Sequence, residues 1–178
     1  MKKLLMVIPL ALILCFMVGC QNKEAMAELE KMKAQAEIEE QNEAIVLRLL
    51  EEMDNKNFEI FNEVYAPDAK VYFPSNITTP MSIEQTVPMA KSFSEAFPDF
   101  NHSIEELIAE GDKVILRAID RGTHQGEFNG IPATGKKIEM GIIVIFKFKE
   151  GKIVEAWEEA DILGLMHQLG MELKPKGD

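Results

Sequence analysis

The stretch KIEMGIIVIFKFKEGKIVEAWEEAD, residues 137–161, sets the architecture of the chain. Apolar and polar residues alternate on both sides of Glu150 and Gly151, and a glycine-containing turn between two such runs is typical of an antiparallel β-hairpin. Two further runs precede it, HSIEELIAE at 102–110 and KVILRAIDRGTH at 113–124, and a Glu-Gly-Asp turn separates them. We therefore expect an antiparallel meander in the second half of the chain.

Helical periodicity occupies the region before these strands. Apolar residues recur at helical spacing from residue 44 to 53, from 58 to 65 and from 83 to 97. The segment KVYF at 70–73 reads as a short strand between the second and third helices. Helices followed by a meander predict an α+β fold.

Proline interrupts the third predicted helix. Pro88 lacks the backbone N–H that a helix interior needs, so it is unfavourable beyond the first turn. Two arrangements satisfy this constraint: the helix begins at Val87 with Thr86 as its cap, or it begins earlier and bends at Pro88.

The first twenty residues, MKKLLMVIPLALILCFMVGC, have the features of a secretory signal. Two lysines precede an uncharged apolar run that is short for a membrane span. The glycine before Cys20 resembles the bacterial lipobox, which implies cleavage before Cys20 and acylation of its thiol. An uncleaved N-terminal anchor is the alternative. Both interpretations predict an extracytoplasmic domain held at the cell membrane.

Four segments follow from these patterns: a lipoprotein signal at 1–20, a charged stalk at 21–41, a globular domain at 42–172 and a tail at 173–178. The stalk is rich in Glu, Ala, Lys and Gln, which favours a solvated helical spacer. A short coiled-coil contact is the alternative for this segment.

Charge and cysteine content exclude several classes of protein. The chain carries 30 Asp and Glu residues against 19 Lys and Arg, a net charge of −11, and such a surface repels nucleic acids. Cys15 lies in the signal and Cys20 is the lipidation site, so we expect no disulfide. The three histidines lack metal-ligand spacing and no phosphate-binding loop is present, so we expect no metal site.

Several motifs occur in an order typical of one family: AFPDF at 96–100, EGDKVILR at 110–117, GTHQGEFNGIPATGK at 122–136, and GKIVEAW at 151–157 followed by an aspartate and GLMHQLG at 164–170. The chain from about residue 42 to 170 resembles the SnoaL-like polyketide cyclase family, often labelled ester cyclase, within the NTF2-like superfamily. The resemblance implies a cone-shaped α+β barrel, in which a curved antiparallel sheet wraps around about three helices and a pocket opens between them.

The same resemblance implies a function. Members often form dimers through the outer face of the sheet, and characterised cyclases use no cofactor or metal. The carboxylate after the tryptophan strand acts as acid and base in an intramolecular aldol closure, and that position here is Asp161. Phe73 and Lys147 stand where many members have histidine and arginine, which favours a more apolar pocket.

Strict alternation along the last strand gives the candidate site. It places five residues on one face: Ile153, Glu155, Trp157, Glu159 and Asp161. If this face is internal, Trp157 and Asp161 line a pocket, where apolar walls such as Ile143 and Ile145 raise the pKa of the aspartate toward neutrality. The alternative is that Asp161 only caps the helix that follows it.

Other candidate residues complete the predicted site. His124, in the long loop, is a candidate partner acid, with a structural role as the alternative. Arg117 either anchors a substrate oxygen or pairs with a glutamate on the outer face. Phe97 and Ile145 are candidate substrate-binding residues.

Three functions are compatible with these patterns. The first is a cofactor-free acid/base enzyme, of the aldol cyclase or isomerase type, acting on a small apolar carbonyl compound. The second is a lipid-anchored module that binds an apolar molecule without changing it. The third is an interaction domain with a filled interior.

Overall fold

The computed structural model describes residues 7–74, 78–172 and 174, with side chains from residue 23 onward. The chain divides into two compact units, Met1–Ile38 and Glu39–Asp178, and helix α1 (Val7–Asp54) contributes to both. In the first unit, every described side chain, from residue 23 to 38, is exposed. Among the described residues no helix is long and apolar enough to cross a bilayer. The side chain of Cys20 and residues 1–6 of the predicted signal lie outside the described part.

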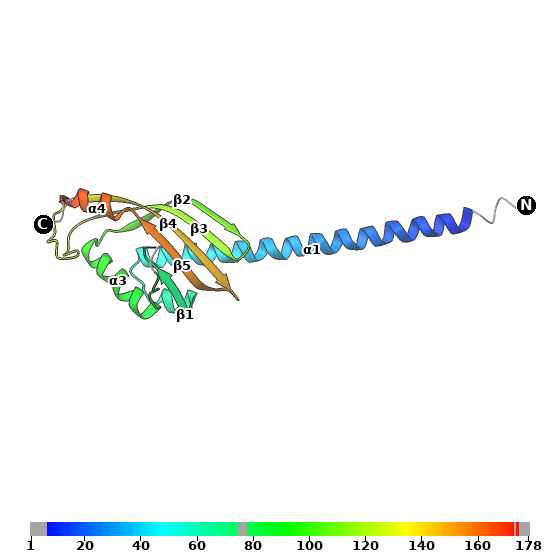
Figure 1. Cartoon of the computed structure of the whole chain (residues 1–178), viewed down its shortest axis with the longest axis horizontal. Coiled ribbons are helices and arrows are strands. Elements are labelled where there is room, and N and C mark those ends of the chain that lie inside the picture. Colours follow the sequence, from blue (N-terminus) through cyan, green and yellow to red (C-terminus); the bar gives the residue numbers. More distant parts are fainter. Residues whose placement is uncertain (1–6, 75–77, 173, 175–178) are drawn as a thin grey trace, which may run out of the picture. The chain divides into compact units, whose positions relative to one another are not determined.

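The second unit is built on one curved, five-stranded sheet with the strand order β1-β5-β4-β3-β2 (Figure 1). Its strands are β1 (Tyr65–Tyr72), β2 (Asn101–Glu110), β3 (Lys113–Thr123), β4 (Lys137–Lys149) and β5 (Lys152–Ala160). The last four pair antiparallel, which confirms the predicted meander and the α+β class. Strand β1 was expected at 70–73, but it begins at Tyr65 and pairs in parallel with β5, so the sheet is mixed.

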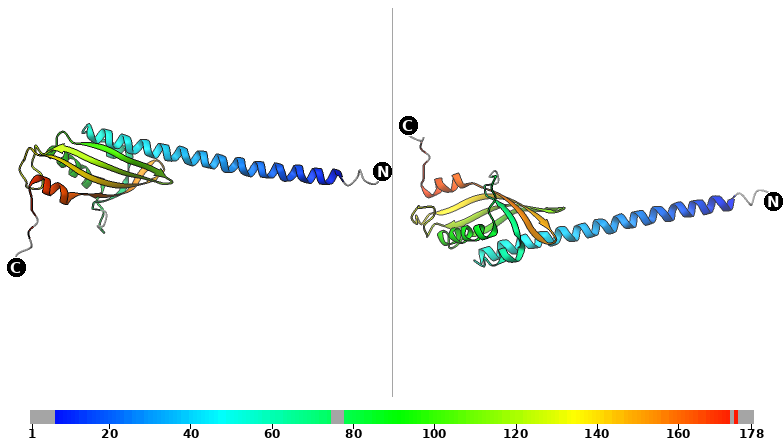
Figure 2. Two further views of the ribbon diagram at one scale, coloured as in Figure 1. Left: turned by 90° about the horizontal axis from the view of Figure 1, so that it is seen from above. Right: turned by 60° about the horizontal axis from the view of Figure 1, so that its bottom comes forward.

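Helices cover the concave face of this sheet. The part of α1 after residue 38, the short α2 (Ile60–Val64) and α3 (Ile83–Ala96) lie on this side of the sheet, and the right-hand view of Figure 2 shows α3 and the end of α1 there. The fourth helix, α4 (Ile162–Leu169), follows β5 directly and contacts β4. In the described part of the chain, no helix forms a layer over the other face of the sheet.

Period-two alternation in the long strands explains why the sheet has one buried face. In β4 every second side chain from Ile138 to Phe148 is buried, and Val114, Leu116 and Ala118 are buried in the neighbouring β3. Successive side chains of a strand point to opposite faces, so the intervening residues face outward. Three outward residues of the sheet are isoleucines with 38–52% of their surface exposed: Ile108, Ile115 and Ile143.

Helix α3 begins at Ile83, which agrees with the predicted arrangement in which the helix starts before Pro88. Ser82 precedes the helix, and its backbone N–H donates to the Gln85 side-chain oxygen at 3.0 Å, which satisfies one of the unpaired donors at the helix start. Pro88 therefore lies inside the helix. The alternative start at Val87 is wrong, because the favourable cap is at Ser82.

A one-residue bulge near the start of β5 shifts its alternation. Phe148 pairs with Ile153, whereas Lys147 pairs with Glu155, so Val154 has no partner on β4. A bulge of this kind exchanges the two faces of the strand beyond it. Ile153 is buried, and after the bulge it is Ala156, Glu158 and Ala160 that share the concave face of the sheet.

Candidate functional site

A cavity of about 790 Å³ lies between the concave face of the sheet and the helices of the second unit. Its volume is in the range of small-molecule binding sites. Aromatic and aliphatic side chains make up most of its wall, among them Phe58, Phe61, Tyr65, Phe73, Phe93, Phe100, Phe128 and Phe146. The interior is therefore not filled by its own side chains, which argues against a solid interaction domain.

Three ionisable side chains lie deep in this cavity: His102 on β2, Asp120 on β3 and Glu158 on β5. His102 and Asp120 are directly opposite each other in the antiparallel pairing of β2 and β3, so their side chains share the concave face. Glu158 lies opposite Val144 two strands away on the same face. Regular sheet geometry thus brings together three groups from distant parts of the sequence.

A fourth group, Asp54 at the end of α1, holds His102 in place. Its carboxylate Oδ1 lies 2.6 Å from the His102 Nδ1, and it also accepts from the His102 backbone N–H at 3.2 Å. Phe100 packs edge-on against the imidazole ring, with centroids 4.8 Å apart. Because a carboxylate is an acceptor only, the contact places a proton on Nδ1 and leaves Nε2 for chemistry in the cavity.

Burial changes the proton affinity of the two carboxyl groups. Asp120 is only 4% exposed, and burial raises the pKa of its carboxyl to about 7, opposed by the charge of His102 and assisted by those of Glu158 and Asp54. Burial likewise raises the pKa of Glu158 to about 7, again opposed by His102. Both shifts arise because a low-dielectric environment disfavours the charged form of an acid.

The pKa of His102 is set by two opposing effects of the same surroundings. Burial lowers the pKa of His102, but the hydrogen bond that its ring donates to Asp54 and the negative charges of Asp120, Asp54 and Glu158 outweigh it, so the net pKa is raised. Burial, together with the charge of Glu158, also raises the pKa of Tyr65. The cavity therefore contains groups that hold or release protons near neutral pH, as general acid/base catalysis requires.

The structure places Trp157 and Ile145 on the opposite face from the cavity, so the expectation that they line it is wrong. These two residues pair across β4 and β5 on the outer face. Trp157 stacks there on Tyr72, with ring centroids 5.7 Å apart. The physical reason is the bulge at Val154, which a strict period of two does not include.

The position of Asp161 differs from the prediction in a similar way. Its Oδ1 accepts a hydrogen bond from the Gly164 backbone N–H at 2.8 Å, so the aspartate caps α4. The residue borders the cavity but is exposed, and the expectation of a dry internal carboxylate at this position is wrong. Asp161 thus lines the cavity and also caps α4, so the alternative that it only caps the helix is not confirmed.

The remaining predicted site residues also lie away from the cavity. His124 and Phe97 are fully buried and their rings stack, with centroids 5.1 Å apart, and the His124 Nδ1 accepts from the Thr134 backbone N–H. Neither residue lines the cavity. Arg117 faces outward and its Nε donates to Glu106 at 3.0 Å, which confirms the outer-face alternative.

Sequence reasoning missed the four residues of the deep cluster, although one of them left a clear signal. Asp120 continues the buried series of Val114, Leu116 and Ala118 at a period of two, and an acid in such a series is unusual. Strict alternation along the last strand places Glu158 on the outer face, because it does not include the bulge at Val154. Asp54 and His102 are far apart in the chain, and no local pattern connects them.

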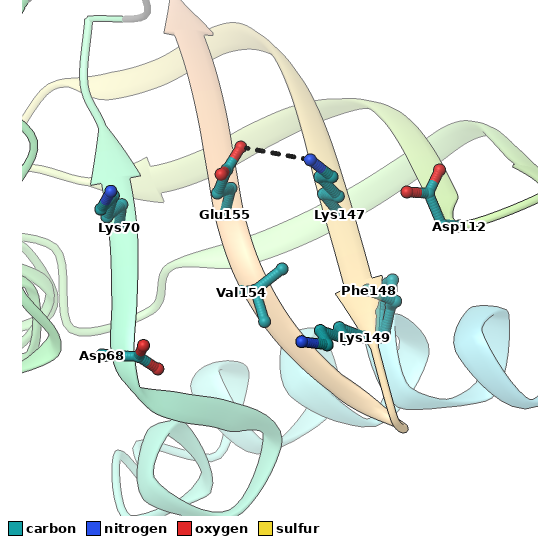
Figure 3. A pocket seen from close by; sticks show the side chains of 8 residues that line it. All are labelled: Asp68, Lys70, Asp112, Lys147, Phe148, Lys149, Val154 and Glu155. Atoms are coloured by element: carbon teal, nitrogen blue, oxygen red, sulfur yellow. Dashed lines mark ion pairs between the residues drawn. The ribbon is translucent and has the colours of Figure 1, made fainter.

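A second, shallower cleft of about 380 Å³ lies among β1, β4 and β5 (Figure 3). Its charged lining residues are Asp68, Lys70, Asp112, Lys147, Lys149 and Glu155, and Lys147 pairs with Glu155 at 3.9 Å. Three acids balance three lysines, so the cleft has no excess charge for a ligand. Among the described residues no cluster has the composition of a metal site.

Comparison with known proteins identifies related sequences and structures. A model of the SnoaL-like polyketide cyclase family matches residues 44–169. The chain is similar to IdmH, a candidate polyketide cyclase from Streptomyces antibioticus, with 28% identity over 73% of this chain and 99% of that chain and a TM-score of 0.65. It is also similar to a candidate SnoaL-like polyketide cyclase from Jannaschia sp. CCS1, with 26% identity over 75% of this chain and 94% of that chain and a TM-score of 0.67.

One structural relative carries a different assignment. AclR, a candidate hydroxylase from Streptomyces galilaeus, shares 28% identity over 76% of this chain and 97% of that chain, with a TM-score of 0.68. A comparison with curated proteins gave no match. Because one fold hosts several chemistries, the activity has to be argued from the site.

The buried cluster predicts an unusual pH dependence of stability. Asp120, Glu158 and His102 have raised pKa values, so the folded state binds more protons than the unfolded state in this pH range. The free energy of unfolding is then highest at acidic pH and falls as the pH rises from the ordinary carboxyl range through about 7. Urea denaturation at pH values spanning this range measures it.

Two variants control this measurement. Asp120→Asn combined with Glu158→Gln should flatten the dependence and raise stability at alkaline pH, because the buried groups no longer ionise. Glu155→Gln, on the outer face of the same strand, should leave the dependence unchanged. A stability that increases with pH over the whole range contradicts the raised pKa values.

Proposed function

Because the chain belongs to the SnoaL-like polyketide cyclase family, we propose that its cavity binds a small, largely apolar carbonyl compound and catalyses proton transfer on it. The reaction is of the aldol cyclase or isomerase type. The observation that carries the proposal is a pair of carboxyl groups, buried Asp120 and partly buried Glu158, each with a pKa raised to about 7, beside His102 in an apolar cavity.

The proton transfers can be assigned to this cluster without a cofactor. One ionised carboxylate of the Asp120 and Glu158 pair removes a proton from the carbon beside the substrate carbonyl. The other carboxyl group, still protonated, donates a hydrogen bond to the carbonyl oxygen and stabilises the enolate. In an aldol closure the enolate carbon attacks a second carbonyl of the same molecule. The first carboxyl group then returns its proton to the new alkoxide.

In this proposal His102 and Asp54 keep the two carboxyl groups in different protonation states. Like charges repel, and the charge of Glu158 raises the pKa of the Asp120 carboxyl, so ionisation of one acid favours the protonated form of the other. The imidazole, oriented by Asp54 at 2.6 Å, lies opposite Asp120 in the sheet and favours ionisation of the carboxyls by its positive charge. Return of the proton to the alkoxide leaves both carboxyl groups in their starting protonation states.

The deep cluster suits this role better than Asp161, the position implied by the family resemblance. The carboxylate of Asp161 is exposed and already accepts the Gly164 N–H of the helix cap. A general base needs a pKa near the working pH, which burial provides at Asp120 and Glu158. Asp161 borders the cavity, and in this proposal it contacts the substrate near the entrance.

A binding module without catalysis is the second candidate function. The wall of the cavity is dominated by phenylalanine and aliphatic side chains, which favour retention of an apolar molecule. Under this alternative the buried acids fix the orientation of the ligand and transfer no proton.

Exchange of carbon-bound protons tests the catalytic proposal without knowledge of the natural substrate. The purified protein in D₂O, with 2-tetralone as an apolar ketone, should speed deuterium incorporation beside the carbonyl, followed by NMR. Asp120→Asn and Glu158→Gln should each reduce the acceleration by about 10²-fold or more, the contribution typical of a positioned acid or base. Asp161→Asn should change it by only a few-fold.

The opposite pattern would transfer the role to Asp161. If Asp161→Asn abolishes exchange while Glu158→Gln retains it, the deep cluster is not the acid/base. If the wild-type protein binds 2-tetralone in native mass spectrometry but never accelerates exchange, binding without catalysis is the better account. Thermal unfolding of each variant excludes loss of the fold as the cause.

We also propose that Cys20 is lipidated and that the domain is held at the outer surface of a cell membrane. The support is the sequence pattern at 1–20 and the exposed, charged helix of residues 23–38 that follows it. In cells fed an alkyne-tagged fatty acid, the wild-type chain should be labelled and Cys20→Ala should not. Cys15→Ala is the matched control and should keep the label; an unlabelled wild-type chain of full mass indicates an uncleaved anchor instead.

We propose, in addition, that two copies of the domain pair through the outer face of the sheet. Exposed isoleucines from three strands lie on this face, including Ile108 and Ile143, and no helix covers them. Native mass spectrometry from detergent should then show a dimer for the wild-type chain and a monomer for Ile143→Lys. Leu47→Lys, at an exposed leucine of α1, should stay dimeric. A monomeric wild-type chain refutes the pairing.

A further inference from the structure

The ionisable groups that line the cavity are unbalanced in charge. Asp120 and Glu158 lie in its depth, Asp161 borders it, and Asp54 contacts it through His102. His102 is the only basic side chain of the lining, because none of the lining residues in the described part of the chain is a lysine or arginine. One imidazole thus faces four carboxyl groups. When these carboxyl groups are ionised, their negative charge exceeds the single positive charge that His102 can supply.

One atom of this cluster has no partner within the protein. The Asp120 Oδ1 is buried and accepts no hydrogen bond from any described residue. Water cannot easily replace this donor, because the residue is only 4% exposed. A buried carboxylate oxygen without a donor is destabilising, so a donor supplied by a ligand is strongly favoured there. Asp120 lines the cavity, where a bound molecule can reach it.

The walls around the cluster suit a cation as well as an apolar body. Phe100 packs against the ring of His102, and Phe93 contacts both Phe100 and Phe128 at right angles, with centroids 5.0 and 5.5 Å apart. Aromatic faces attract cations, and they also accept aliphatic and aromatic groups. The cavity therefore offers negative charge at one end and aromatic surface beside it.

We propose that the preferred ligand of this cavity is an apolar compound carrying a basic nitrogen, whose ammonium group donates to Asp120 and is attracted by the charge of Glu158, while its apolar part packs on the phenylalanines. This inference rests on the same cavity as the proposed function and concerns a ligand held there rather than the reacting carbonyl compound, because an ammonium group paired with Asp120 removes that carboxyl group from the proton transfers. The ammonium group supplies both the missing positive charge and the missing donor for the Asp120 Oδ1. A neutral molecule of the same shape supplies only the donor.

The position of the ligand follows from the sheet. Asp120 on β3 and Glu158 on β5 face the same space from either side of β4, whose inward residues here are Met140, Ile142 and Val144. None of these three can compete for the ammonium group. The lining residues of α3 are also without charge, so the nitrogen is directed to Asp120, whose Oδ1 lacks a donor.

A matched pair of probes tests the inference by calorimetry on the full chain. 1-Naphthylmethylamine and the neutral 1-naphthylmethanol have the same aromatic body and differ in charge. The amine should bind about tenfold or more tightly than the alcohol near neutral pH, as expected for a charge pair shielded from water. Asp120→Asn and Glu158→Gln should each remove most of this preference and leave alcohol binding nearly unchanged, and Glu155→Gln should preserve it.

The pH dependence provides a second readout. Amine affinity should fall as the pH is lowered through about 7, because protonated carboxyl groups carry no charge for the ammonium group, whereas alcohol affinity should stay level. The groups facing this site are Asp54 from α1, Tyr65 at the start of β1, His102 from β2 and Asp161 before α4. Protonation of His102 acts in the same direction, since it adds positive charge beside the ligand.

The result that overturns the inference is distinct from failure of the proposed catalysis. Equal or tighter binding of the alcohol, or no binding of the amine, shows that the cavity does not select a basic nitrogen. The 2-tetralone exchange measured on the same sample then reports on catalysis by itself. Exchange without amine preference overturns the ligand class alone, and amine preference without exchange overturns the catalytic proposal alone.

Discussion

Val154, the unpaired residue of β5, determines which side chains the last strand directs into the cavity. The hairpin turn at Glu150 and Gly151 sets one register, with Phe148 opposite Ile153, and the bulge shifts it by one residue. Without that shift Trp157 would lie opposite Val144 on the concave face, and Glu158 would face outward. The chemistry of the site therefore depends on one extra residue in a strand.

A raised pKa explains how an acid is tolerated on the concave face. Burying an ionised carboxylate is costly unless it is paired, and the ordinary response is a raised pKa with the proton retained. Glu158 and Asp120 follow this rule, and His102 moderates it through its positive charge. The stability lost by placing them in the apolar interior is what gives them proton affinities suited to catalysis or ligand recognition near neutral pH.

The same cluster connects elements that are separate in the sequence. Asp54 ends α1, His102 begins β2, and the hydrogen bond between them joins the helix layer to the far edge of the sheet. A substitution at Asp54 therefore affects both the orientation of the imidazole and the packing of α1. This coupling distinguishes the deep cluster from Asp161, whose cap on α4 depends only on neighbouring residues.

Sequence periodicity predicted the elements of the second unit well and its site poorly. The antiparallel strands and the helix containing Ile83 were predictable, because their apolar residues recur at periods that local geometry imposes. The parallel pairing of β1 was not, since it joins segments distant in the chain. Trp157 was placed on the wrong face because a bulge leaves no trace in the alternation of KIVEAWEEA. Asp120 was predictable from its position in an apolar series, whereas the contact of Asp54 with His102 depends on the complete fold.

The central claim is that Asp120 and Glu158 face a common apolar cavity and retain protons near neutral pH. Titration of the side-chain carboxyl carbons by ¹³C NMR tests it most directly, with Asp120→Asn and Glu158→Gln used to assign the two signals. The account predicts midpoints near 7 for both groups, and a lower midpoint for each when the other is replaced by its amide. Midpoints in the ordinary acidic range of exposed carboxyl groups, with no effect of one substitution on the other signal, would contradict it.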